Sequence, residues 1–503
     1  MRFNFLKIES FRRGIIFSSF FNFVAKGLVF FQGLVIAYYF GAQAATDVYF
    51  YCFSTITLAA LFINTLDSSV IVPEAMRLAE SEGREAAMKF FNFFIYLYIG
   101  IGLLTAAIFY ISPVRIILLI SRFDAAKLEE ARTILLLSIP LFFLIITTNL
   151  LANILASYKY FTMPMMVNAI NGLSALGFLV LLHENFGIAS LLVGTLASYL
   201  LNLCFLLYVM NKQLSWTFAF QRIHLSTTTK WNILMAQAGN ITSTFANYFP
   251  MYLMSSFGAG ALTSFTYGQK TSEIPNQVIN LQFAAVAGIK FNSLNAKNEL
   301  LALDSVFFRS CKTLLAIQLP IAVFMSVYHT EIIDLFFRRG AFDNETAEAS
   351  AVFLKYFALL LPLYSMNQLT ARLFMATQKI KEAFWYQITL NVFLVSGYYI
   401  MVEKLGPVGL PIALITIHTF SFLFCFFLFR WFFPFIHYSR VLKIFPALCA
   451  MILAPAVSIF YLRAYFAIEN PFVSLVAGGT FFVGAVAIIY YLTGTLRDIL
   501  KKG

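Results

Sequence analysis

Two oppositely charged residues and a proline lie close together inside an apolar stretch of this chain. In "TSFTYGQKTSEIPNQVINLQF", which runs from Thr263 to Phe283, Lys270 and Glu273 stand three positions apart and Pro275 follows. A charged side chain at bilayer depth costs at least ~2.5–3.5 kcal/mol, so it needs a partner or a function there. Residues three apart share a helix face, and a proline kinks a helix. The stretch therefore predicts a bent helix that presents both charges together.

A second lysine stands deep in another apolar run. Lys26 lies near the middle of residues 15–40 and has no carboxylate near it in the sequence. An ammonium group is a compact point charge that binds phosphate without a fixed bidentate geometry. Lys26 and Lys270 together are thus suited to a phosphate or pyrophosphate group in a cavity. The alternative for Lys270 is an ion pair with Glu273 that only joins helices, and for Lys26 it is a lysine that snorkels to the membrane surface.

Three more charged residues lie nearer the ends of apolar runs. Asp47 opens the run that follows residues 15–40, and Asp67 lies close to the other end of the same run. Asp67 either snorkels or pairs with a basic loop residue, or it has a functional role, and the sequence leaves these two possibilities open. Arg372 lies four residues from the end of its run, where it suits the membrane interface or a phosphate contact.

The composition identifies a membrane protein. Of the 503 residues 60% are hydrophobic and 12% charged, and the mean hydropathy is +0.81. The net charge of +12 does not indicate a nucleic-acid-binding protein, because the basic residues lie in short loops between apolar runs. The five cysteines are scattered through apolar runs without motif spacing, so neither a metal site nor a disulfide framework is expected.

The apolar runs predict an all-α polytopic protein with about fourteen transmembrane helices. The basic residues orient it: with the N-terminus inside, inner loops and tails hold 23 of the 35 Lys and Arg residues, and outer loops hold 8. Both termini are therefore expected in the cytoplasm. Because the outer loops are short, no domain is available to house an enzyme. The predicted spans are 15–40, 47–72, 88–111, 132–157, 160–182, 187–211, 231–257, 261–289, 307–328, 351–376, 384–403, 407–429, 444–464 and 471–493.

An internal repeat divides these spans. "FGAQAATDVYFY" begins at Phe40 and "FGAGALTSFTYG" begins at Phe257, with five identical residues at a constant offset of 217. Both join an outward-going span to an inward-going one, six spans apart, as in transporters built from parallel repeats. We therefore expect an N-terminal lobe of six spans in residues 1–222, a C-terminal lobe of six in 223–436, and two appended spans in 437–503.

The chain resembles the MurJ/MviN-type lipid II flippases of the multidrug/oligosaccharidyl-lipid/polysaccharide exporter superfamily. The resemblance extends along almost the whole chain. It rests on four segments: "YFGAQAATDVYF" after the first span, "YGQKTSEIP" in the eighth, "LFFRRGAFDNETAEASA" before the tenth and "LTARLFMATQKIK" at its end.

The resemblance implies the export of a lipid-linked peptidoglycan precursor by alternating access. It further implies a V-shaped cavity between two lobes and a lipid-tail groove formed by the last two spans. The family's substrate-binding basic positions fall on Lys26, Lys270 and Arg372. Asp47 matches the family's aspartate after the first span, Glu273 and Pro275 match the eighth-span motif that contains Lys270, and these three residues are expected to gate or couple transport. No cofactor is implied. The partners are a lipid-linked oligosaccharide and membrane lipids, and the protein is expected to be a monomer in the bacterial inner membrane.

Departures from the family pattern leave the substrate open. Gln32, Ala59 and Ala60 stand where the family has arginines, and lysines replace the retained cavity arginines. The expected substrate is lipid II or another polyprenyl-pyrophosphate-linked saccharide, moved from the inner to the outer leaflet. Coupling to the membrane potential, H⁺ or Na⁺ is equally open. The alternatives are a cation-coupled drug antiporter of the same superfamily, a membrane-embedded glycosyltransferase and a scaffold without transport activity.

Overall fold

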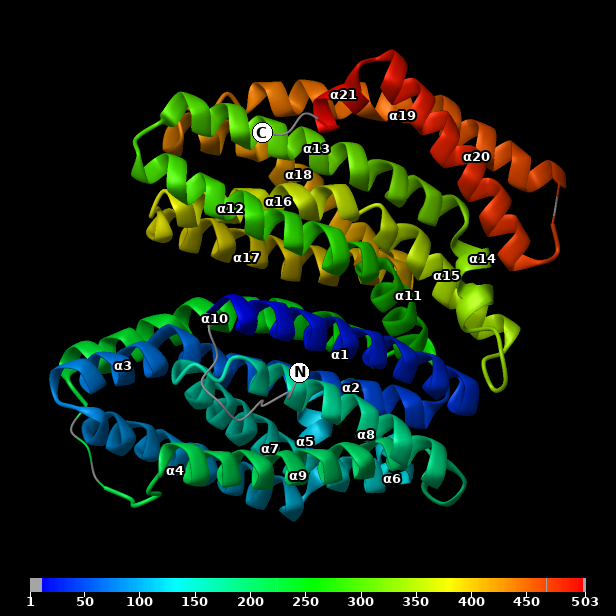
Figure 1. Ribbon diagram of the computed structural model, residues 1–503. Coiled ribbons are helices and arrows are strands. Elements are labelled where there is room, and N and C mark those ends of the chain that lie inside the picture. Colours follow the sequence, from blue (N-terminus) through cyan, green and yellow to red (C-terminus); the bar gives the residue numbers. More distant parts are fainter. Residues whose placement is uncertain (1–10, 222, 224, 467, 501–503) are drawn as a thin grey trace. The chain divides into compact units, whose positions relative to one another are not determined.

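The computed structural model describes residues 11–500 except 222, 224 and 467, and every regular element within them is a helix (Figure 1). The predicted all-α polytopic architecture is thereby confirmed. The basic residues of the two chain ends that lie in 1–10 and 501–503 fall outside the described residues.

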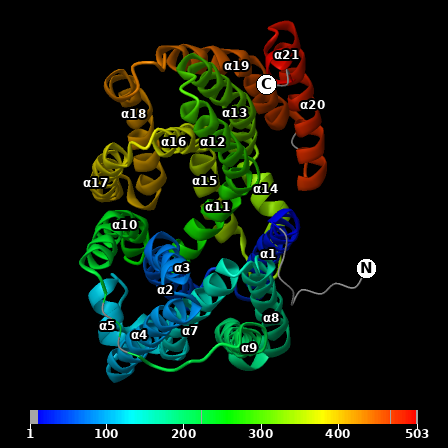
Figure 2. The ribbon, with the colours of Figure 1, turned by 60° about the vertical axis from the view of Figure 1, so that its left-hand side comes forward.

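The first compact unit comprises residues up to Thr263 and the second begins at Ser264. In the first unit α8 packs against both α1 and α9, while α7 contacts α2, α4 and α9, and Figure 2 shows α8 and α9 side by side. Within the described residues, its helices are α1 (Phe11–Phe40), α2 (Ala44–Leu66), the π-helical η1 (Asp67–Ile71), α3 (Val72–Ser81), α4 (Arg84–Ile111), α5 (Pro113–Ile120), α6 (Ala125–Glu130), α7 (Arg132–Ser157), α8 (Thr162–Phe186), α9 (Ala189–Leu214) and α10 (Thr227–Met254).

The second unit has a comparable set of helices. The segment α11 (Ala261–Pro275) begins at the boundary between the units and continues into the second one. There α13 contacts α15, α16 and α19, and α17 pairs with α18. The further helices are the π-helical η2 (Asn276–Asn280), α12 (Leu281–Ala296), α13 (Leu300–Val327), α14 (His329–Phe336), α15 (Asn344–Ala358), α16 (Leu361–Ala376), α17 (Ile380–Leu405), the 3₁₀ turn η3 (Gly406–Val408), α18 (Gly409–Phe432), α19 (Ser439–Phe466), α20 (Pro471–Leu492) and α21 (Thr495–Leu500).

The helices begin where the sequence supplies start signals. The hydroxyl of Ser226 accepts from the Thr229 N–H at the start of α10, and Asp343 does the same for Thr346 at the start of α15. Asn470 caps α20, whose first residue is a proline. Such side chains satisfy N–H groups that the first helical turn leaves without partners.

The repeat detected in the sequence recurs in the order of the helices. Residue 44, where α2 begins, and residue 261, where α11 begins, are separated by the offset of 217. The starts of α4 and α13 differ by 216 residues. So do those of α5 and α14, and both of these helices are eight residues long. Both α2 and α11 also run without a break into a π-helical turn. The two halves therefore share one helical plan.

Fewer helices pass a test of length and apolarity than the fourteen spans predicted. Ten helical segments in the described residues are long and apolar enough to cross a membrane, or eleven if α15 and α16, bent by 45°, form one span. The continuous stretch α17–α18 counts once in this test. Neither α10 nor α11–η2–α12 is among them, although each coincides with a predicted span. These two segments carry many polar side chains, so the number fourteen stays a prediction.

The expected lobe boundaries, 1–222, 223–436 and 437–503, also stay predictions. The expected boundaries follow the sequence repeat, which assigns α10 to the C-terminal lobe. The compact units follow packing instead, and α10 packs against α2 in the first unit. At the C-terminal end α19 packs on α13, and α20 packs on α19 and α14.

Candidate functional site

Asp47 connects the two halves of the repeat within the first unit. Its side chain is buried, and its carboxylate accepts hydrogen bonds from the N–H of Gly260 at 2.7 Å and from the N–H and hydroxyl of Thr263 at 2.8 and 2.6 Å. Gly260 directly precedes α11 and Thr263 lies in its first turn, where N–H groups lack helical partners and a negative charge is favoured. We name the contact of Asp47 with Gly260 and Thr263 the turn latch.

Gly260 permits this close approach. Its φ is +86°, and a Cβ atom there would lie 2.7 Å from the carbonyl oxygen of Ala42. Residues with a side chain rarely adopt such a φ. The turn at 40–47 and its repeat counterpart at 257–264 thus touch through backbone atoms, which explains why this position of the turn is a glycine.

Further polar contacts follow α10 along α2. The hydroxyls of Tyr51 and Tyr248 lie 2.7 Å apart and both donate to the carbonyl of Ile120. Farther along the helix pair, Asn240 donates to the Thr65 hydroxyl at 2.9 Å. The contact between α10 and α2 is therefore not only apolar.

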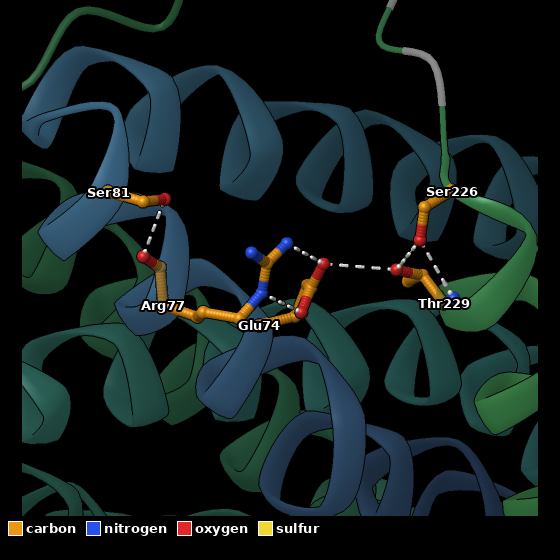
Figure 3. A network of polar contacts seen from close by, with 5 residues as sticks. All are labelled: Glu74, Arg77, Ser81, Ser226 and Thr229. Atoms are coloured by element: carbon orange, nitrogen blue, oxygen red, sulfur yellow. Dashed lines mark hydrogen bonds and ion pairs between the residues drawn. The ribbon is translucent and has the colours of Figure 1, made fainter.

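A charged cluster continues this contact beyond the end of α2 (Figure 3). Glu74 in α3 accepts from Arg77 through both of its oxygens, at 2.8 and 2.9 Å, and from the hydroxyl of Thr229 in α10 at 3.0 Å. The Ser226 hydroxyl accepts from the Thr229 N–H at 3.0 Å and lies 2.8 Å from the Thr229 hydroxyl. Glu74 therefore connects the start of α10 with α3.

In the second unit, Lys270 and Glu273 lie together on α11. Lys270 is exposed and Glu273 is half-buried, and the two attract each other electrostatically. Gln277, one turn further on, donates to Glu273 at 3.5 Å. Pro275 ends α11, and the next five residues form the π-helical turn η2. Since proline has no N–H to donate, a change in the hydrogen-bond pattern at this point follows from the sequence.

Arg372 lies far from these residues along the same unit. The aliphatic part of its side chain packs over Gly288 of α12, where an added Cβ would lie 3.1 Å from the Arg372 Cδ. Gly288 is 18 positions after Lys270, which corresponds to ~27 Å along a helix rising 1.5 Å per residue. Arg372 and Lys270 are therefore too far apart to bind the same pyrophosphate in this structure.

Lys26 is half-buried in α1, which packs against α8. Leu28, two residues further on, approaches Gly172 of α8 closely, with 3.0 Å between its Cβ and an added Gly172 Cβ. Lys26 belongs to the first unit and Lys270 to the second. The contacts of each lysine are therefore described within its own compact unit.

Of the two possibilities for Asp67, snorkelling or a pair with a basic loop residue is wrong. Asp67 is 0% exposed, so it does not snorkel, and its side-chain partners are Tyr98 and Asn153 rather than a basic loop residue. Its position at the start of a π-helical turn gave no signal in the sequence.

The partners of Asp47 and the tyrosine pair Tyr51–Tyr248 were also missed, because residues about two hundred positions apart meet there.

Comparisons with known proteins agree with this architecture. A family model described as "Lipid II flippase MurJ" matches residues 36–479. A protein of Borreliella burgdorferi named "Probable lipid II flippase MurJ" is 24% identical over 380 residues, which are 74% of this chain and 74% of that protein.

Solved structures show the same fold. A lipid II flippase MurJ in an inward closed conformation matches with a TM-score of 0.80 and 19% identity, covering 97% of this chain and 100% of that one. An inward-facing multidrug resistance transporter of the MATE family matches with a TM-score of 0.65 and 15% identity, covering 84% and 95%. Since the family model spans well over half of its residues, the chain belongs to the family of the lipid II flippase MurJ.

Proposed function

We propose that this chain moves lipid II across the bacterial cytoplasmic membrane, from the inner to the outer leaflet, by alternating access. The observation that carries the proposal is the position of Lys270, an exposed cation beside Glu273 on the polar helix α11 of a MurJ-family chain. A pyrophosphate group needs such a cation when it leaves water.

The candidate residues have separate roles in this proposal. Lys26 and Lys270 bind the pyrophosphate while the cavity holds it, and Arg372 binds it at another stage of transport because of its distance from Lys270. The turn latch of Asp47 closes the outer side, and Glu273 with Pro275 adjusts the position of Lys270. The polyprenyl tail of the substrate lies along α19 and α20.

The protein acts as a monomer with both termini in the cytoplasm. Transport needs no bound cofactor and no catalytic step, and an ion gradient or the membrane potential drives it. The likeness to multidrug transporters concerns the fold, so it does not favour drug export over lipid export.

Complementation tests the proposed substrate. The chain is expressed in a bacterium whose own lipid II flippase can be depleted, and immunoblotting confirms that it reaches the membrane. Growth after depletion supports lipid II transport. Lysis in spite of normal membrane levels contradicts it, and then directs attention to another polyprenyl-pyrophosphate-linked glycan.

A further inference from the structure

Asp67 is a buried carboxylate in the middle of a continuous helical segment. It begins the π-helical turn η1 between α2 and α3, and its side chain is inaccessible to solvent. Residue 67 lies 23 positions after the start of α2, which is ~35 Å at 1.5 Å per residue and places it toward the inner end of the span. An ionised carboxylate in such surroundings is costly unless it is compensated. π-helical turns are often found at functional sites.

Two neutral side chains from two other helices donate to this carboxylate. The Tyr98 hydroxyl of α4 donates to Oδ1 at 2.7 Å, and the Asn153 amide of α7 donates to Oδ2 at 3.2 Å. A metal cation would instead need several oxygen ligands whose lone pairs face it. Here the neighbouring groups direct hydrogens at the carboxylate, so the arrangement suits a proton as the ligand.

The Tyr98 hydroxyl has a second acceptor within reach. It lies 3.5 Å from the carbonyl oxygen of Ile63, one turn before Asp67. In a regular α-helix the Asp67 N–H would donate to Ile63, but here it donates to the carbonyl of Asn64. If Asp67 takes up a proton, its hydroxyl can donate to the Tyr98 oxygen, while Tyr98 donates to Ile63. The site can therefore satisfy both forms of Asp67.

The charged groups on the surrounding helices lie some distance along the chain from this position. On α3, Glu74 and Arg77 pair with each other, two to three turns beyond Asp67. The titratable residues of α10 are Lys230, which is exposed at its start, and two tyrosines near its other end. On α7, Arg132 is the ionisable residue, at the opposite end from Asn153. On α4, Tyr98 contacts Asp67, whereas Arg84, Glu85 and Lys89 lie near the start of the helix and Tyr96 and Tyr110 are exposed.

We propose that Asp67 reversibly binds one proton and that this changes how firmly α4 and α7 hold the π-helical turn of α2. The proton comes from water and bonds to a carboxylate oxygen, so the charge of the side chain changes from −1 to 0 and no other covalent bond changes. With the charge lost, the bond from Asn153 weakens, and Tyr98 accepts from Asp67 instead of donating to it. This coupling role rests on the proposed transport function, whereas the proton binding itself does not.

Infrared spectroscopy of the purified full chain in lipid nanodiscs tests proton binding directly. The carbonyl stretch of a protonated, buried carboxyl group is followed between about pH 5 and about pH 9, a range above the ordinary titration of an exposed aspartate. The expected result is one band that disappears reversibly as the pH rises. It is absent in Asp67→Asn and retained in the control Asp124→Asn, which removes an exposed carboxylate whose side chain does not cap its helix.

A second variant keeps the test valid if Asp67→Asn does not fold. Tyr98→Phe removes a donor to the ionised form, so the band should persist to higher pH, by about one unit. A band that is absent throughout the range, or unchanged throughout it, overturns the proposal. So does a band that NaCl removes at constant pH when choline chloride does not, since that indicates a sodium site.

Transport is scored separately in the flippase-depleted strain. If cells that carry Asp67→Asn grow more slowly than cells with the wild-type chain, the coupling role is supported. If they grow equally well over the same pH range, the coupling role is overturned. A chain that titrates normally but does not rescue the strain at all contradicts the proposed substrate and leaves the proton site standing.

Discussion

Asp47 binds Thr263 through two hydrogen bonds, from the backbone N–H at 2.8 Å and from the hydroxyl at 2.6 Å. Thr263 is the repeat counterpart of Thr46, the residue just before Asp47. Neighbouring positions of the two copies of the repeated turn thus contact each other within the first compact unit. The two copies of the turn are therefore joined there by buried polar bonds.

Replacing the aspartate should destabilise the protein strongly. Asp47→Ala leaves two N–H groups of the α10–α11 turn without an acceptor, at about 1–3 kcal/mol each. Thr263→Val is the matched variant, because it removes only the hydroxyl bond and should cost about 1–2 kcal/mol. Thermal unfolding of the detergent-purified proteins checks the order wild type, Thr263→Val, Asp47→Ala. Equal melting temperatures for Asp47→Ala and wild type would contradict the latch.

The two glycines of this turn should respond differently to alanine. Gly260→Ala places a Cβ 2.7 Å from the Ala42 carbonyl at a φ of +86°, whereas a Cβ at Gly258 meets no atom within 4 Å. Gly260→Ala should therefore lower the melting temperature and the yield of monodisperse protein, with a strain of at least ~1 kcal/mol. Gly258→Ala is the control and should behave like the wild type. Similar losses in both variants would show that the contact with Ala42 is not the cause.

The contact between α3 and α10 can be measured with a double-mutant cycle. Glu74→Gln removes the charge of the acceptor and Thr229→Val removes the donor of the bond between the two side chains, which is 3.0 Å long. We expect a coupling free energy of about 0.5–1.5 kcal/mol for this partly buried bond. Thr228→Val, at the exposed neighbouring position, is the control and should show no coupling with Glu74→Gln. Additive effects of Glu74→Gln and Thr229→Val would mean that the bond contributes nothing.

Lys270 and Arg372 should act independently. Gly288, over which the Arg372 side chain packs, lies ~27 Å along the helix from Lys270, which prevents a shared ligand in this structure. The growth defects of Lys270→Ala and Arg372→Ala should then multiply in the double variant, because distant sites without shared partners are additive in free energy. Gln387→Ala, at an exposed position of α17, is the control for unrelated changes. If the double variant has no larger growth defect than Lys270→Ala alone, both residues act at the same step of transport, which contradicts the prediction.

Much of the helical plan could be predicted from local sequence. Apolar runs located each long helix, and the match of Phe40 with Phe257 gave the offset that separates the starts of α2 and α11. The number of spans was harder to predict, since α10 and α11–η2–α12 carry polar side chains that belong to contacts or to the candidate site.

The contacts of the site could not be predicted in the same way. The sequence singled out Asp47, Lys270 and Glu273 because charges are rare in apolar runs. It did not show that Asp47 caps α11, because its partners lie 213 and 216 residues away. Nor did it show that Asp67 is enclosed by Tyr98 and Asn153, because a tyrosine and an asparagine in apolar helices have no periodic signature.

The most direct measurement concerns Lys270 in cells depleted of their own lipid II flippase. Growth is compared for the wild-type chain, Lys270→Ala, Lys270→Arg and the control Lys290→Ala, which removes an exposed lysine of α12, at matched membrane levels. We predict rescue by the wild type, Lys270→Arg and Lys290→Ala, and no rescue by Lys270→Ala, because the pyrophosphate then lacks a cationic partner when it leaves water. Full rescue by Lys270→Ala at normal levels would contradict the assignment of the pyrophosphate to this lysine.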